Sequence, residues 1–182
     1  MRGYRYFLAL STPPEIRDRI DALRVSLGLT RKAIARERLH MTLAVIAMQR
    51  DRPCLEIGTA MGAALRDLAL PGYLVRLDMR QGGMLVCSEG PRGFAGLQRL
   101  VLHRLFRCGI GVDALPFRPH VSLSHDGGSA GRHPIAPIEW QARYLELIES
   151  HLGESRHVPV RSWRIGTREM RAPRQLGFWE AA

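Results

Sequence analysis

Two short segments of the sequence combine a histidine with a hydroxyl side chain at the same spacing. One reads HMTL and begins at His40, and the other reads HVSL and begins at His120. A neutral imidazole accepts a proton and an imidazolium donates one, and both forms exist near pH 7. Two histidines on opposite sides of a phosphorus atom can therefore exchange one oxygen for another without a metal, one as general base and the other as general acid. The residues alone do not say which histidine takes which role.

Thr42 and Ser122 follow the two histidines by two residues. In an extended strand alternate side chains point to the same face, so each hydroxyl, and then Ala44 or Ser124, shares a face with its histidine. From there the hydroxyls can donate hydrogen bonds to the non-bridging oxygens of a phosphate. Structural histidines beside ordinary strand hydroxyls would explain one such segment, but two segments in matching context favour chemistry. We expect the two histidines and the two hydroxyls to line one cleft.

The hydrophobic pattern around these segments predicts an α+β fold with largely antiparallel sheet. Strands are expected at 4–11, 39–47, 73–80, 83–88, 119–124 and 157–165. Helices are expected from a capping box at 12–15 to Gly28, at 53–69 and at 91–108, and a glycine-rich loop at 126–131. Segment 138–150 fits a strand or a helix. The repeated histidine strand fits two similar lobes within a single domain over 1–182, with an irregular tail from about residue 167.

The paired segments, with PFRP at 116–119 leading into the second, resemble the two-histidine (2H) phosphoesterase superfamily. Within it, the pattern is most similar to the bacterial and archaeal RNA 2′,3′-cyclic phosphodiesterases, also known as 2′-5′ RNA ligases. The opening strand YRYFLAL and the Leu39 that precedes His40 add to the resemblance, which spans roughly residues 4–165. The chain departs from that branch where AVIA at 44–47 replaces a Phe-Leu-Gly ending, and where His125 replaces an arginine.

The resemblance implies two pseudo-symmetric lobes of antiparallel β-sheet around a central cleft, with the helices outside and a strand at 138–150. It implies hydrolysis of the terminal 2′,3′-cyclic phosphate of RNA to a 2′-phosphomonoester, with His40 and His120 as acid and base and Thr42 and Ser122 on the phosphate. A weak reverse reaction would join RNA ends. Two alternatives stay open: a phosphodiesterase for a small cyclic nucleotide such as ADP-ribose 1″,2″-cyclic phosphate, and a non-catalytic RNA-binding protein with this fold.

Three further residues are candidates for substrate binding. Arg118 alternates with His120 and can face a phosphate, although a solvated arginine is equally consistent. Phe7 is a candidate because similar proteins place an aromatic residue of the first strand near the nucleobase; core packing is the alternative. His125, at the end of the second motif strand, either contacts substrate or is merely exposed.

No metal or cofactor is expected. His125, Asp126 and His133 lie close in sequence, but neither a cysteine nor a second nearby carboxylate completes a metal site. The remaining histidines of the chain's helices and strands, at positions 103, 151 and 157, are expected at the surface. There is no phosphate-binding Walker loop and no G-x-S-x-G nucleophile motif.

Composition and charge describe a globular, basic chain. It has 182 residues, of which 46% are hydrophobic, and a formal net charge of +10, with Lys32 as the one lysine. A GC-rich genome accounts for the preference for arginine, but the excess of positive charge favours a phosphate-bearing partner, here RNA 3′ ends or cyclic nucleotides.

No apolar run approaches the ~18 residues of a membrane span, and no signal peptide is expected. Three scattered cysteines without a C-x-x-C indicate a reduced cytoplasm, and no obligate protein partner is inferred.

Overall fold

The structure, a computed structural model, describes residues 4–46, 61–62, 65, 70–78, 83–88, 93–113, 117–125 and 132–166. The expected loop at 126–131 and the expected tail from 167 lie outside these residues, as does most of the helix expected at 53–69. Met61 and Leu65, which that helix would place on its buried face, are 1% and 0% exposed.

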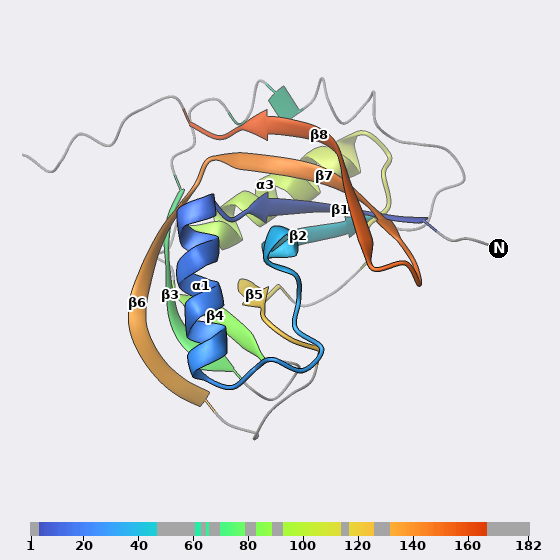
Figure 1. Ribbon diagram of the computed structural model, residues 1–182. Helices are drawn as coiled ribbons and strands as arrows, with labels where there is room; N and C mark the ends of the chain where they lie inside the picture. Colours follow the sequence, from blue (N-terminus) through green and yellow to red (C-terminus); the bar gives the residue numbers. More distant parts are fainter. Residues whose placement is uncertain are drawn as a thin grey trace, which may run out of the picture.

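The described strands form two four-stranded sheets in which every pairing is antiparallel. The strand orders are β2-β1-β7-β8 and β5-β4-β3-β6 (Figure 1). The motif strands β2 and β5 each occupy an edge of their sheet and contact each other. The strands are β1 (Tyr4–Ser11), β2 (His40–Ile46), β3 (Leu70–Asp78), β4 (Met84–Ser88), β5 (His120–Ser122), β6 (Arg132–Ala142), β7 (Tyr144–His151) and β8 (Arg156–Arg164).

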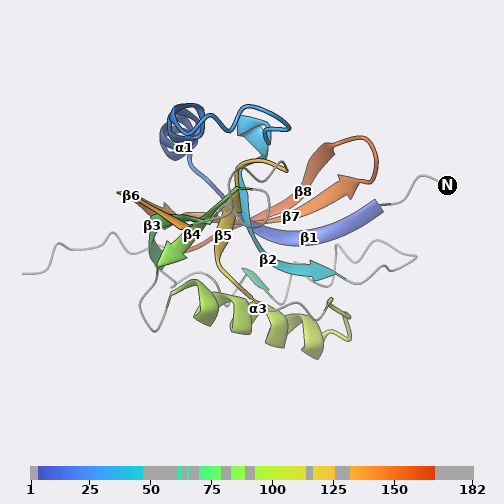
Figure 2. The ribbon, with the colours of Figure 1, turned by 90° about the horizontal axis from the view of Figure 1, so that it is seen from below.

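Each motif strand is reached by the same connection. In the first sheet β1 leads through helix α1 (Pro14–Ser26) to its neighbour β2, and in the second β4 leads through α3 (Phe94–Arg107) to its neighbour β5. Figure 2 shows α1 and α3 on opposite sides of the strands. The repeated β-α-β connection and the matching strand orders confirm the expected α+β fold of two similar antiparallel lobes with helices outside.

The two helices bury one apolar face each. Helix α1 buries Ile16 and Ile20, while α3 buries four residues at helical spacing, Phe94, Leu97, Val101 and Leu105. These side chains join residues of both sheets in one main hydrophobic core. Gly28, with φ +68°, lies just beyond the end of α1 as expected, because a left-handed backbone there costs glycine little. Along the described residues, neither helix has the length and apolar character needed to cross a membrane.

The expected capping box at the start of α1 is wrong. Pro13 occupies the N-cap position, and no side chain caps the helix. Thr12 is fully buried instead, and its Oγ1 donates a hydrogen bond to the Leu39 carbonyl oxygen at 2.9 Å. This bond ties the beginning of α1 to the residue that precedes His40.

The ambiguous segment 138–150 is two strands rather than a helix. Strand β6 ends at Ala142 and β7 begins at Tyr144, so the chain passes from one sheet to the other with a single residue between them (Figure 1). Ile138 and Trp140 are buried, whereas Glu139 and Gln141 are exposed, which is the alternation of a strand. The strand that the resemblance implied is therefore confirmed.

Candidate active site

A polar cavity of about 220 Å³ lies where the two motif strands meet. His40 and Thr42 of β2 line it together with His120 and Ser122 of β5. The structure thus brings together the four residues that the sequence singled out, from the two edge strands of different sheets. Ile34, Arg38, His125 and His157 complete the described lining of this polar cavity.

The two motif histidines are held in the same way. Nδ1 of His40 lies 2.6 Å from the carbonyl oxygen of Arg38, and Nδ1 of His120 lies 2.6 Å from that of Arg118. A carbonyl oxygen only accepts hydrogen bonds, so Nδ1 donates in both rings. In the neutral imidazole the lone pair is then on Nε2, which is the atom left to exchange protons with a ligand.

The surroundings of His40 favour its neutral form. Burial lowers the pKa of His40 below its ordinary value of 6.5, and the positive charges of Arg38 and His120 lower it further. The hydrogen bond to the Arg38 carbonyl acts in the opposite direction but does not outweigh burial. Near neutral pH, His40 is therefore set to accept a proton.

A third histidine belongs to the cavity, and the expectation that it lies at the surface is wrong. His157 of β8 lines the polar cavity, and its ring is 5.5 Å from that of His40 between centroids. Its Nε2 accepts a hydrogen bond from Arg38 Nη2 at 3.4 Å. Burial, together with the charges of Arg38 and His40, lowers the pKa of His157 to about 4. No motif surrounds His157 in the sequence; the pairing of β7 with β8 brings it to the site.

The ring of Phe7 packs against the imidazoles of both His40 and His157. Phe7 is 7% exposed, its ring stacks on His40 with centroids 5.0 Å apart and an angle of 28°, and it meets His157 edge to face at 5.1 Å. With Ala9 and Ile148 it forms a small second core on the face of the first sheet opposite the main core. Phe7 therefore packs against the histidines, and it is not among the described residues that line the polar cavity.

A β-bulge corrects the alternation expected along β2. Thr42 pairs with Ala9, but Ala44 pairs with Leu8, so Leu43 has no partner across the strand. Beyond the bulge the faces exchange: Ala44 enters the main core, while Val45 packs against the Phe7 cluster. The predicted face of histidine and hydroxyl holds through Thr42 and fails at Ala44.

The segment before each motif strand pairs with the end of the other motif strand. Ala33 forms a bridge with Ser124, and Val112 forms a bridge with Ile46. Ser124, which was expected on the cleft face, is 2% exposed and donates from Oγ to the Arg31 carbonyl at 2.8 Å. These reciprocal links fix the position of each histidine strand relative to the other.

The other sequence candidates take different positions. Arg118 is half-buried and lines a second, apolar pocket, and its carbonyl oxygen orients His120. His125 is exposed and borders the polar cavity, while its backbone N–H donates to the Lys32 carbonyl at 3.1 Å. The described residues hold no group of three or more potential metal ligands, and Asp126 lies outside them.

The two remaining histidines differ from each other. His103 on α3 is exposed, as expected. The His151 side chain is only 10% exposed and lies 3.0 Å from the buried carboxylate of Glu149, which also accepts a hydrogen bond from the Tyr6 hydroxyl. The expected surface position of His151 is therefore wrong.

No protein-family model and no curated protein sequence matches the chain. Solved structures do. Escherichia coli LigT in complex with 3′-AMP superposes with a TM-score of 0.72 at 22% identity, covering 91% of this chain and 99% of LigT. TT0787 of Thermus thermophilus gives 0.73 at 17% identity, covering 90% and 100%. A structure described as a phosphoesterase gives 0.69 at 21% identity, covering 90% and 99%. The chain therefore has the fold of the two-histidine phosphoesterases.

Proposed function

We propose that the protein is a metal-independent phosphodiesterase that opens the 2′,3′-cyclic phosphate at the 3′ end of RNA to a 2′-phosphomonoester. One observation carries the proposal. The polar cavity is lined by two imidazoles that are each fixed through Nδ1, and each has a hydroxyl two residues along its strand. That arrangement supplies one base, one acid and two hydrogen-bond donors around a space of phosphate size.

The reaction assigns a different proton transfer to each histidine. Neutral His40 accepts a proton at Nε2 from a water molecule whose oxygen forms a bond to phosphorus. The bond from phosphorus to O3′ breaks on the opposite side, and the His120 imidazolium donates its Nε2 proton to that oxygen. The phosphate stays on O2′, His40 ends protonated and His120 ends neutral. We assign the base to His40 because its lowered pKa favours the neutral form.

Arg38 supplies positive charge at the same place. Its guanidinium lies in the cavity lining and donates to a neutral imidazole, that of His157, and no carboxylate among the described residues pairs with it. Its buried Nε also has no hydrogen-bond partner within the described part of the chain. A half-buried guanidinium in this state favours an anionic ligand. Thr42, Ser122 and Arg38 would share the non-bridging phosphate oxygens.

The ligands of a structural neighbour agree with this assignment. LigT has been crystallised with 3′-AMP, with phosphate and with ATP. Each of these molecules carries the phosphate group that the polar cavity is proposed to bind. The shared fold makes a nucleotide phosphate a reasonable ligand for this chain as well.

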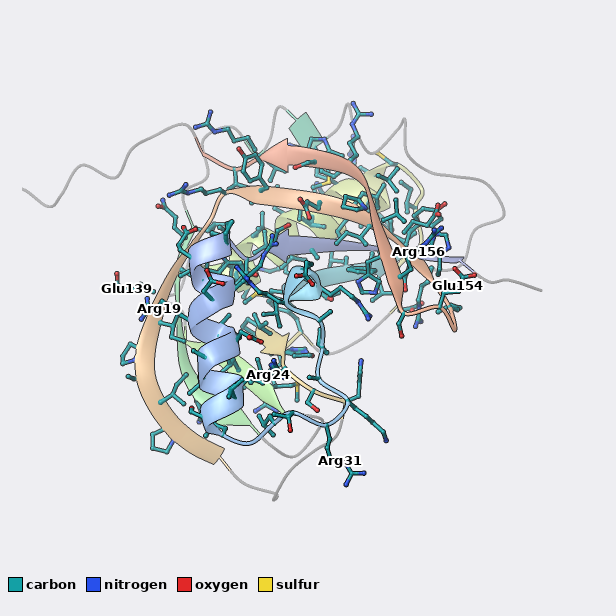
Figure 3. The ribbon with its side chains drawn as sticks, in the orientation of Figure 1. Arg19, Arg24, Arg31, Glu139, Glu154 and Arg156 are labelled. Atoms are coloured by element: carbon teal, nitrogen blue, oxygen red, sulfur yellow. The ribbon has the colours of Figure 1, made fainter. Side chains whose placement is uncertain are left out.

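A small cyclic nucleotide, such as ADP-ribose 1″,2″-cyclic phosphate, is the alternative substrate. The arginines outside the cavity give it specific support, because several are already paired with acidic side chains. Arg36 pairs with Asp18, and Arg5 is 2.5 Å from Asp113. Figure 3 shows Arg19 and Arg24 on α1, Arg31 in the loop after that helix and Arg156 at the start of β8, so these charges are spread over distant parts of the molecule. A scattered charge of this kind guides a long RNA less well than a continuous basic strip.

The test is hydrolysis of a short RNA ending in a 2′,3′-cyclic phosphate, in the presence of EDTA, with the product identified by ³¹P NMR. We expect a 2′-phosphate as the product and undiminished activity in chelator. The same RNA with an open 3′-phosphate is the control and should not react. Absence of turnover, or turnover that requires a divalent metal, would contradict the proposal.

A further inference from the structure

A second pocket adjoins the polar cavity and shares two of its residues. Thr42 and His120 line both spaces, so the second pocket begins next to the residues that would hold a phosphate. This apolar pocket has a volume of about 480 Å³ and lies between β2, α3 and the segment that leads to β5. The two spaces therefore adjoin at Thr42 and His120, and they differ in chemical character.

The lining of the apolar pocket contrasts with that of the polar cavity. The apolar part of its described walls consists of Leu43, Ala44 and Val45 of β2, Leu102 of α3, Val112 and Phe117. Binding of a flat, poorly hydrated group to such walls is favourable, because it removes apolar surface from water. The volume is within the range of small-molecule sites, whereas the polar cavity is below it and suits a phosphate.

Besides Thr42 and His120, which it shares with the polar cavity, the apolar pocket has three polar side chains among its described lining: Gln98, Asp113 and Arg118. Gln98 of α3 lines it and is half-buried, and its side-chain amide has no hydrogen-bond partner among the described residues. An amide both donates and accepts, which matches the edge of a nucleobase. Asp113 also lines the pocket, but its carboxylate already binds Arg5. Gln98 is thus the uncharged amide that can both donate to and accept from a base edge, while Phe117 offers an aromatic wall.

We propose that the apolar pocket is the nucleobase subsite for the nucleotide whose phosphate occupies the polar cavity. The inference rests on the proposed function, because the phosphate position fixes where the attached base can lie. Its consequence is that the aromatic residue beside the base is Phe117. Phe7, the candidate for that role in the sequence, instead packs against the rings of His40 and His157.

The test compares a nucleotide with phosphate alone in a variant that fills the pocket. Leu102→Phe narrows the apolar pocket without touching the polar cavity. Leu100→Phe is the matched control, because Leu100 is also a half-buried residue of α3 packed against the main core but does not line the pocket. Adenosine 2′-monophosphate and inorganic phosphate are titrated into each full-length protein by calorimetry.

We expect the wild-type protein to bind adenosine 2′-monophosphate more tightly than phosphate, and Leu102→Phe to weaken nucleotide binding by about tenfold or more. Phosphate binding should be unchanged in both variants, and Leu100→Phe should leave nucleotide binding unchanged. Gln98→Leu is a second variant that removes only the polar group, and it should lower affinity for the nucleotide but not for phosphate.

Equal loss of phosphate and nucleotide affinity in Leu102→Phe, or no loss of either, would overturn the subsite. The same holds if the wild-type protein binds the nucleotide no better than phosphate. These titrations need no turnover, so they are separate from the hydrolysis assay. If the wild type hydrolyses the cyclic phosphate but Leu102→Phe does not weaken nucleotide binding selectively, the subsite alone is contradicted. If Leu102→Phe weakens nucleotide binding selectively but the wild type does not hydrolyse the cyclic phosphate, the proposed function alone is contradicted.

Discussion

His157 meets His40 edge to face, with the ring centroids 5.5 Å apart, and both rings contact Phe7. The pKa of each histidine is lowered first by burial, and in both cases the positive charge of Arg38 adds to the effect. Because the pKa values of both imidazoles are lowered, protonation of the folded site at acid pH is unfavourable. This effect can be measured both in stability and in catalysis.

We expect the free energy of unfolding to decrease as the pH falls from about 6.5 to about 4, the unfolded and folded pKa values of His157. In that range the unfolded chain takes up a proton on this histidine and the folded protein does not, so protonation draws the equilibrium toward the unfolded state. Above about 6.5 the contribution of His157 is constant. Urea unfolding across a pH series measures the slope.

The variant His157→Asn should show a shallower loss of stability over the same pH range, because it removes one of the two resistant imidazoles. His103→Asn, at an exposed position on α3, is the control and should keep the wild-type slope. An unchanged slope in His157→Asn would show that this imidazole takes up its proton equally in both states.

Arg38 is expected to set the acid limb of the pH–rate profile. The positive charge of Arg38 lowers the pKa of His40, so Arg38→Gln should raise that pKa. Because kcat/KM falls when the base becomes protonated, the acid limb should move to higher pH in the variant. The magnitude of kcat/KM should also fall, since a charge beside the phosphate is lost.

Arg36→Gln is the control for this change. Arg36 is exposed and pairs with Asp18, and it neither lines the polar cavity nor contributes to the pKa of His40. Its acid limb should coincide with that of the wild type. An acid limb of Arg38→Gln at the same or lower pH would argue against His40 as the base.

The two pairs of a histidine and a hydroxyl could be predicted from the sequence, because they depend only on the local alternation of side chains in a strand. His40 and Thr42, and likewise His120 and Ser122, are two residues apart in strands, so alternation alone placed each pair on one face. The structure adds the backbone carbonyl two residues before each histidine as the group that orients it. That detail depends on the conformation of the approach to each strand, which no composition rule specifies.

The parts that escaped prediction depend on long-range pairing. His157 reaches the cavity because β8 pairs with β7, and nothing near it in the sequence indicates this. The bulge that leaves Leu43 unpaired is set by the match between β1 and β2. Thr12 carried a capping signature, but burial gave its hydroxyl a better partner in the Leu39 carbonyl. In each case a tertiary contact overrides a local preference.

Replacement of either motif histidine by asparagine should lower kcat/KM on a cyclic phosphate by about 10²–10⁴-fold, the usual contribution of a positioned acid or base. Asparagine can still donate an N–H to the carbonyl that holds Nδ1, so His40→Asn and His120→Asn should fold. Circular dichroism and thermal unfolding check the fold. Wild-type activity in either variant would remove that histidine from the mechanism.

Salt dependence separates RNA from a small cyclic nucleotide as the substrate. A net charge of +10 exceeds what one cyclic phosphate needs and favours RNA, whereas the pairing of Arg36 with Asp18 and of Arg5 with Asp113 leaves fewer of these charges for a nucleic-acid backbone. Each RNA phosphate that the protein neutralises releases counterions. The logarithm of the binding constant of an oligonucleotide therefore falls with the logarithm of the salt concentration, with a slope of about 0.7 per phosphate, whereas binding of a mononucleotide changes little.

We expect a higher kcat/KM for an RNA ending in a 2′,3′-cyclic phosphate than for a cyclic mononucleotide at low salt, with the difference shrinking as salt rises. The comparison uses RNAs of two, four and eight nucleotides with the same 3′ nucleotide, each assayed across one salt series. Arg31→Gln, in the loop after α1, should reduce the difference if that loop contacts the RNA backbone, because it removes one charge outside the cavity. Equal kcat/KM values for every length at low salt would instead favour the small cyclic nucleotide, since the charge outside the cavity would then play no part in catalysis.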